Sequence, residues 1–229
     1  QNKFSKTVTV QRNSGKEKVI LSSSAKSAEE QLDKAITQRI DAKQKFKQIE
    51  AYTKLVIKGT KPSFILTGDP GLGKSFSISK VLQSEGMVRG EDYEIFKGDI
   101  ASAVNLYQIL YEHNIPDFIV VLDDNDEILK DAAAVNILKG ALESGKDEAR
   151  TISYYSQRMP KDESGERIPT KFEYVGKMIF ISNKYLRDLP SALKSRAFKT
   201  ELDLNPEEIV EHISEIAYNI SDLQGVPHS

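Results

Sequence analysis

Apolar residues in this chain occur in two patterns, short continuous runs and longer stretches with helical spacing. The short runs predict β-strands over residues 63–67, 93–97, 117–124, 176–183 and 199–204. Apolar runs without alternation are typical of strands that are buried on both faces of a sheet. The pattern therefore predicts a parallel sheet whose strands are separated by helices.

Between these runs, apolar residues recur every three or four positions, which predicts helices. The expected helices cover residues 74–84, 102–114 and 132–144, with a short piece at 190–198. An earlier helix is expected to begin at Ser27, where Ser-Ala-Glu-Glu forms a capping-box pattern. Helices that alternate with parallel strands cover both faces of a sheet, so the expected fold class is α/β.

The chain divides into three parts by composition. Residues 1–27 are basic, and two β-prone runs around an Asn-Ser-Gly turn predict a hairpin arm. This arm is either a solvated peripheral segment or a nucleic-acid contact. Residues 28–204 carry the strands and helices of the expected core. Residues 205–229 are expected to form a partial helical lid, with Pro206 in the first turn of its helix.

Composition narrows the class of protein. The chain has 229 residues, a formal net charge of −2 and no cysteine, which excludes disulfides and thiolate metal sites. No apolar run approaches the roughly 20 residues needed to cross a bilayer. The first residues also lack the apolar core of a signal peptide. We therefore expect a cytoplasmic protein that has no membrane partner.

A glycine-rich segment follows the first core strand. It matches the phosphate-loop pattern G-x-x-x-x-G-K-[ST] and lies between a predicted strand and a predicted helix. Glycines allow backbone N–H groups to turn toward phosphate oxygens, and a helix N-terminus attracts anions. Lys74 is expected to reach the β- and γ-phosphates, and the Ser75 hydroxyl is expected to bind Mg²⁺. The predicted nucleotide-binding residues are Gly68, Asp69, Pro70, Gly71, Leu72, Gly73, Lys74, Ser75 and Phe76.

The third core strand ends in two acids, Asp123 and Asp124. An apolar strand that ends in an acid is the Walker B pattern. The pattern is common by itself, but the preceding phosphate loop favours a functional role for these acids. Asp123 is expected to hold the Mg²⁺ shell, and Asp124 to orient and deprotonate the attacking water.

Four motifs in this order resemble an AAA+ ATPase module of the P-loop NTPases: GDPGLGKS, IVVLDD, IFISN and ALKSRAF. The resemblance covers about residues 50–215, and the chain looks similar to the compact AAA+ ATPases that bacteriophages encode. It implies a three-layer sandwich in which the sensor strand lies between the two Walker strands. It also implies an ATPase that uses ATP and Mg²⁺, in the host cytoplasm if a phage encodes it.

The resemblance assigns two further catalytic residues beside Lys74 and Asp124. Asn183 matches sensor 1, which implies a place beside the two acids and a role in positioning water. Arg196 matches the arginine finger, which acts on the nucleotide of a neighbouring subunit, and Arg187 is a second candidate. A surface salt bridge is the alternative for Arg196. An arginine that acts in trans implies a nucleotide-dependent homo-oligomer, in a ring or a helix, that remodels DNA or a protein complex.

Two departures from the family pattern leave other functions open. Many members have Asp-Glu at the end of the Walker B strand, whereas this chain has Asp124, which is shorter by about 1.5 Å. This difference is expected to slow hydrolysis unless Asp126 shares the role. The expected lid offers no counterpart of the arginine that senses nucleotide from a later lid helix, which implies either a truncated chain or a reduced lid. A nucleotide-dependent binding switch and a P-loop small-molecule kinase therefore remain alternatives.

Residues 149–175 are longer than a connection in an α/β fold requires. Two β-prone runs joined by a polar turn predict a β-hairpin before sensor 1, similar to an insertion in some AAA+ branches. Its cations and tyrosines are candidates for DNA contacts, but nearby acids nearly cancel its charge. We expect a solvated hairpin or one that docks on a neighbouring subunit. The residues concerned are Tyr154, Tyr155, Arg158, Lys161, Arg167 and Lys171, with the acids Asp162, Glu163 and Glu166.

Overall fold

The computed structural model describes residues 9–11, 18–20, 43–143, 150–156, 159–162, 164–210 and 214. The chain divides into two compact units, Gln1–Lys43 and Gln44–Ser229. In the first unit, β1 (Thr9–Gln11) pairs antiparallel with β2 (Lys18–Ile20), as the predicted hairpin requires. The helix start at Ser27 lies outside the described residues, so the boundary predicted there stays a prediction.

The second unit is built on five parallel strands in the order β4-β5-β8-β3-β9. This confirms the predicted parallel sheet. The order places β8 between β5 and β3, so the three strands that precede the predicted site residues are neighbours. The strands are β3 (Ser63–Gly68), β4 (Tyr93–Lys97), β5 (Ile119–Asp123), β8 (Lys177–Ser182) and β9 (Phe198–Leu202).

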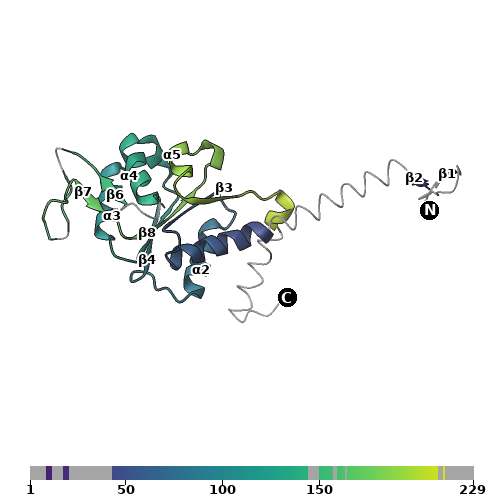
Figure 1. Cartoon of the computed structure of the whole chain (residues 1–229), viewed down its shortest axis with the longest axis horizontal. Coiled ribbons are helices and arrows are strands. Elements are labelled where there is room, and N and C mark those ends of the chain that lie inside the picture. The colour runs from purple at the N-terminus through teal and green to yellow at the C-terminus, as the bar shows by residue number, and fades with distance from the viewer. Residues whose placement is uncertain are drawn as a thin grey trace. The chain divides into compact units, whose positions relative to one another are not determined.

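Helices cover both faces of this sheet. Figure 1 shows α4 and α5 on one side of the sheet and α2 on the other. Residues 44–57 are also helical, and two short 3₁₀ helices that the sequence pattern did not predict follow β5 and β8. The helices are α2 (Lys74–Ser84), α3 (Ala103–Glu112), α4 (Ala132–Leu142), α5 (Ser191–Lys194), η1 (Asp126–Lys130) and η2 (Leu186–Asp188).

Successive side chains of each strand pack against opposite helical layers, because strand side chains alternate between the two faces of a sheet. Ile65, Leu122 and Phe180 are fully buried in a cluster with α3 and α4. Phe64, on the other face, packs edge-on against Tyr52 of the helix at 44–57. Burial on both faces explains why the strands are continuously apolar, and the result is the expected three-layer α/β sandwich.

The predicted hairpin is present, and its strands β6 (Thr151–Ser153) and β7 (Lys171–Glu173) pair antiparallel. Aromatic packing fixes it to α3. The Tyr107 ring lies 5.4 Å from the Tyr154 ring and 5.2 Å from the Phe172 ring, centroid to centroid. The Tyr107 hydroxyl also donates a hydrogen bond to the Pro169 carbonyl, 2.7 Å away. Tyr154 is therefore held in packing, whereas Tyr155 is 75% exposed.

The remaining predictions on the hairpin and the lid are met in part by the described residues. Lys161, Arg167 and Lys171 are exposed, whereas Arg158 and Glu163 lie outside the described residues. Residues 206–210 are helical, as expected for the lid, and its continuation is described only at residue 214. Within the part of the chain that the structure describes, no helix is long and apolar enough to cross a membrane.

Gly68, at the end of β3, approaches the neighbouring strand so closely that a side chain would not fit. A Cβ atom there would lie 2.2 Å from the backbone oxygen of Leu202, and φ of Gly68 is 143°. We expect Gly68→Ala to lower the free energy of unfolding by about 3 kcal/mol through overpacking and backbone strain, as measured by urea denaturation.

Gly86→Ala is the matched control for this measurement. Gly86 also has a positive φ, 82°, but an added Cβ would meet no atom of the described residues within 4 Å. Only the backbone strain applies there, so the expected loss is about 1 kcal/mol. Equal losses in the two variants would contradict the close approach of β3 and β9.

Candidate active site

The phosphate loop connects the end of β3 to the start of α2, as the sequence predicts. Gly71 and Gly73 have φ values of 83° and 80°, in the left-handed region that glycine tolerates best. Gly73 is the N-cap residue of α2, so the loop runs directly into the unpaired N–H groups of the first helical turn. Leu72 is 4% exposed and anchors the loop in the core. This arrangement can hold an anion.

The other predicted loop residues lie at the surface of this segment. Asp69 and Pro70 are exposed, Ser75 is half-buried in the first turn of α2, and Phe76 is 45% exposed. Ser75 therefore lies partly exposed at the start of α2, next to Lys74. Because the Phe76 side chain is exposed, this residue is not part of the buried core.

Lys74 is 5% exposed, and its ammonium donates to three oxygen atoms. These are the carbonyls of Gly68 and Asp69, at 2.7 and 2.8 Å, and Asn183 Oδ1, at 2.8 Å. Burial lowers the pKa of Lys74, and the nearby carboxylates of Asp123 and other acids oppose that shift. The ammonium thus lies inside the loop, where it donates to three protein oxygens. The phosphate oxygens of a nucleotide are expected to accept from the same ammonium.

Asp123 ends β5 and is almost fully buried, with 4% of its surface exposed. Its Oδ2 atom accepts no hydrogen bond from any residue that the structure describes. The Lys97 ammonium lies 3.8 Å from this oxygen, which is within ion-pair range but too far for a hydrogen bond. A buried carboxylate oxygen without a hydrogen bond is unusual, so this atom has room for a further ligand.

The donor set suits Mg²⁺ bound together with a nucleotide. The described residues hold no cluster of three or more His, Cys, Asp or Glu that could bind a metal by themselves. Mg²⁺ commonly takes one or two protein oxygens and completes its shell with phosphates and water. Asp123 Oδ2, which accepts no hydrogen bond from the described residues, and the half-buried Ser75 fit that requirement, so the two predicted metal ligands are compatible with the group.

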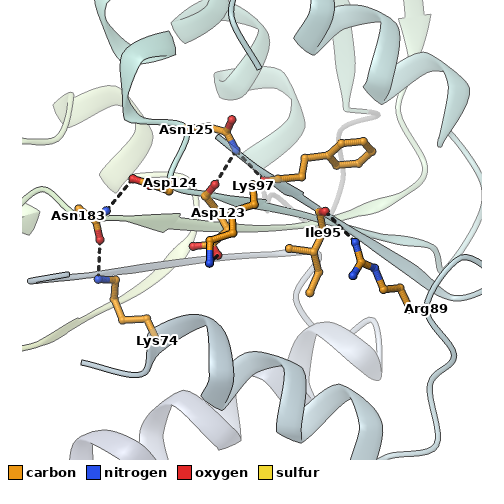
Figure 2. Close-up of polar contacts among 9 residues, drawn as sticks. Lys74, Arg89, Ile95, Lys97, Asp123, Asp124, Asn125 and Asn183 are labelled. Carbon is orange, nitrogen blue, oxygen red and sulfur yellow. Dashed lines mark hydrogen bonds and ion pairs between the residues drawn. The ribbon is translucent and has the colours of Figure 1, made fainter. Parts of the chain in front are cut away.

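Asp124 and Asn183 are in direct contact. Asn183 Nδ2 donates to Asp124 Oδ1 at 2.7 Å, while Asn183 Oδ1 accepts from Lys74. Figure 2 shows this chain of contacts from the loop lysine to the second acid. Asp124 is exposed and has φ of 57°, a left-handed conformation that is rare for residues other than glycine. The structure therefore brings Lys74, Asn183 and Asp124 together at one edge of the sheet.

Asp126 holds the end of β8 in place. Its Oδ1 accepts from the Ser182 hydroxyl at 2.6 Å, and its Oδ2 accepts from the backbone N–H of Asn183 at 2.8 Å. Both oxygens are thus engaged, so the geometry gives Asp126 a positioning role toward Asn183. It does not support the hypothesis that Asp126 shares the activation of water with Asp124.

Asn125 and Lys97 are site residues that sequence reasoning missed. Asn125 is 2% exposed, and its amide donates to the carbonyls of Phe96 and Asp123 at 2.7 and 2.9 Å. Its Oδ1 accepts from the Ile100 N–H at 3.0 Å, so it joins the ends of β4 and β5. An Asn directly after two acids reads as a turn residue. Lys97 gave no signal, because its place beside Asp123 depends on strand pairing.

Tyr185, in the segment after β8, is influenced by Asp69 of the phosphate loop. The charge of the Asp69 carboxylate raises the pKa of Tyr185. The Arg187 guanidinium lies over the Tyr185 ring, 4.6 Å from its centroid. Arg187, the second finger candidate, is therefore stacked on an aromatic residue of the same chain.

Arg196 lies at the end of the short helix α5, where it forms an ion pair. Its Nε atom is 3.0 Å from Glu143 Oε2, at the C-terminal end of α4, and its Nη1 atom donates to the Ala192 carbonyl. This contact is the surface salt bridge that the sequence analysis left as the alternative. The role of Arg196 toward a neighbouring subunit stays a prediction.

No family model matches the chain. A relative among curated proteins is an uncharacterized 36.7 kDa protein from the nrdC-mobD intergenic region of Enterobacteria phage T4, which is 27% identical over 191 residues. The match covers 79% of this chain and 57% of that protein, so the chain spans little more than half of the relative's length.

Two solved structures are similar to parts of the chain. One is a DNA polymerase III gamma subunit-related protein from Thermotoga maritima, with a TM-score of 0.45, 14% identity and coverage of 70% of this chain and 47% of that one. The other is NtrX from Brucella abortus in complex with ATP, with a TM-score of 0.46, 12% identity and coverage of 79% and 41%. The strand order and the loop geometry described above show a three-layer α/β fold in which a glycine-rich loop of the phosphate-loop pattern joins a parallel strand to a helix.

The left-handed backbone at Asp124 can be tested by two substitutions that remove the same carboxylate. Asp124→Gly relaxes the backbone, whereas Asp124→Ala keeps a Cβ atom at positive φ. We expect the glycine variant to be more stable by about 0.5–1 kcal/mol, after allowing for the larger unfolded-state entropy of glycine. Urea denaturation measures the difference, and an alanine variant of equal or greater stability would refute the strained conformation.

Proposed function

We propose that this chain binds ATP with Mg²⁺ and hydrolyses ATP as an oligomeric AAA+ ATPase that remodels DNA or a protein complex. One observation carries the proposal: Lys74, Asp123, Asp124 and Asn183 converge beside a positive-φ glycine loop at the carboxyl ends of β3, β5 and β8. Ligands of parallel α/β sheets bind at this edge.

Lys74 is the residue that would bind the β- and γ-phosphates. Its ammonium now uses three oxygens of the protein, and the oxygens of the β- and γ-phosphates offer the same charge-assisted hydrogen bonds. Its burial strengthens an interaction with an anion, because water competes less in a partly desolvated site. Nucleotide binding then releases Asn183 Oδ1 from Lys74, which frees the sensor amide to reorient.

Mg²⁺, held by Ser75 and Asp123, would neutralise charge on the β- and γ-phosphates. Asp124 is exposed at the same edge, where its carboxylate can orient a water molecule and accept its proton. Asn183, which already donates to Asp124, would fix the direction of that carboxylate. Asp126 in turn fixes Asn183 through the backbone N–H.

A second candidate function has a specific observation in its favour. Asp124 is a short side chain whose Oδ1 already accepts from Asn183, so its reach toward a water at the γ-phosphate is limited. A site of this kind favours tight binding with slow hydrolysis. The chain would then be a nucleotide-dependent binding switch. A small-molecule kinase would instead show turnover that depends on an acceptor.

The oligomer and its client follow from the hypothesis for Arg196. Its ion pair with Glu143 is partly exposed, and we expect a phosphate of a neighbouring subunit to compete with Glu143 for the guanidinium. The exposed Tyr155 and the hairpin cations support a client with phosphates and bases, although acids share that surface. A protein client is the other possibility, and the host cytoplasm is the proposed location because the T4 relative is phage-encoded.

Lys74→Met and Asp124→Asn are expected to separate binding from hydrolysis. Lys74→Met removes the phosphate contact, and we expect at least a tenfold loss of affinity for a fluorescent ATP analogue, equivalent to about 1.4 kcal/mol. Asp124→Asn keeps binding but is expected to lower single-turnover phosphate release by about a hundredfold or more. Tight binding by the unmodified protein without phosphate release would favour the switch. A folded protein that binds neither ATP nor GTP at millimolar concentration in the presence of Mg²⁺ would refute the proposal.

Mixing two inactive variants tests the proposed action of Arg196 in trans. Lys74→Ala and Arg196→Ala are each expected to lose most ATPase activity, because each damages a different half of a shared site. A mixture is expected to recover a substantial part of the activity, since some interfaces then combine an intact loop with an intact arginine. An Arg196→Ala variant that is fully active alone, with no dependence on protein concentration, would exclude a role in trans.

A further inference from the structure

Lys97 lies at the end of β4 and faces the acidic end of β5. The two strands pair in parallel, with Lys97 directly opposite Asp123. Residues opposite one another in a sheet share a face, so both side chains leave the sheet on the same side. The Lys97 ammonium lies 3.8 Å from Asp123 Oδ2 (Figure 2). Strand register therefore fixes a lysine beside the candidate Mg²⁺ ligand.

This ion pair leaves the carboxylate incompletely satisfied. Asp123 Oδ2 is buried and accepts no hydrogen bond from the residues that the structure describes. Buried oxygens normally have a hydrogen-bond partner, because losing water without a replacement is unfavourable. Lys97 thus supplies an opposite charge but leaves the lone pairs of Oδ2 open to another ligand.

Lys97 is also the member of the pair that can move away. Its side chain is 69% exposed, whereas that of Asp123 is 6% exposed. An exposed ammonium is rehydrated as soon as it withdraws, and the attraction that it loses is screened by solvent. Lys74, the other nearby cation, is bonded to two loop carbonyls and to Asn183 and has no such freedom.

We propose that Lys97 is an exchangeable counter-ion of Asp123. It neutralises the carboxylate while no divalent cation is bound, and it withdraws when Mg²⁺ arrives with the nucleotide. The inference rests on the proposed function, because it concerns the cation of the proposed ATP site. It makes Lys97 a positioning residue that competes with the metal and so sets the Mg²⁺ concentration at which the site fills.

Removing the charge of Lys97 is expected to tighten metal binding. In the full chain with a non-hydrolysable ATP analogue, we expect Lys97→Met to lower the half-saturating Mn²⁺ concentration about two- to fivefold, the scale of an exposed ion pair. The electron paramagnetic resonance signal of free Mn²⁺ measures this directly. Lys97→Arg keeps the charge and is expected to resemble the unmodified protein.

Lys171→Met is the matched control for net charge. Lys171 is an exposed lysine on β7, in the hairpin, so this variant loses the same single charge at another surface. Its half-saturating Mn²⁺ concentration is expected to stay within measurement error of the unmodified value. Equal tightening in both variants would show an effect of net charge alone and would overturn the proposal.

A second measurement needs neither metal nor nucleotide. In EDTA, Lys97→Met is expected to lower the midpoint of thermal unfolding, because Asp123 loses its counter-ion. In an Asp123→Asn background the same substitution is expected to have no such effect. A merely structural role of the Lys97 side chain would give the same loss in both backgrounds, which would overturn the pairing.

The outcomes separate this inference from the proposed function. Unchanged or weaker Mn²⁺ binding by Lys97→Met, in a protein that does bind Mn²⁺ with the analogue, would overturn the exchange while the proposed function stands. If metal-free analogue also binds more weakly to this variant, Lys97 contacts phosphate instead. An unmodified protein that binds neither Mn²⁺ nor analogue would refute the proposed function, and with it the exchange.

Discussion

The parallel pairing of β3, β8 and β5 is the constraint on which the candidate site depends. Parallel strands end at the same edge of a sheet, so the residues that follow them become neighbours despite long separations in the chain. Lys74 and Asn183 are 109 positions apart, yet their side chains share a hydrogen bond of 2.8 Å. The close approach of Gly68 to the backbone of Leu202 brings the start of the loop against β9, on the other side of β3. Any shift in this register would separate the lysine, the acids and the asparagine.

Charge at this edge is balanced by contacts that a ligand can replace. Lys74 is buried with three oxygen partners, while Asp123 is buried with an oxygen that accepts no hydrogen bond from the described part of the chain. Groups of this kind are costly to leave unmatched in a partly desolvated environment. Asn125 donates to two carbonyls and accepts from one N–H, and each carboxylate oxygen of Asp126 accepts a hydrogen bond, so these two residues hold the backbone beside the other candidate site residues. The site thus combines a fixed frame with side chains whose partners can be exchanged.

The hairpin and the candidate finger are attached to the same end of α4. Arg150, at the base of the hairpin, donates to the Ala141 carbonyl, and its guanidinium lies 5.0 Å from the centroid of the Tyr174 ring. Burial lowers the pKa of Arg150, whose contacts are carbonyls and an aromatic face. Glu143, which follows α4, pairs with Arg196. These two contacts therefore place the base of the hairpin and Arg196 at the same end of α4.

The sequence alone determined the layers and the order of the elements. Continuous apolar runs required strands buried on both faces, and the glycine pattern before Lys74 required a loop that only positive-φ residues allow; both are local properties. Tertiary structure alone decided which side chains meet. Lys97 lies beside Asp123 because β4 pairs with β5, and Asp126 accepts from the Ser182 hydroxyl and the Asn183 N–H because β8 ends beside it. Asn125 reads as an ordinary turn residue until the strand ends that it joins are placed. Side-chain contacts across a sheet depend on strand order and register, and these arise from packing between segments that are distant in the chain.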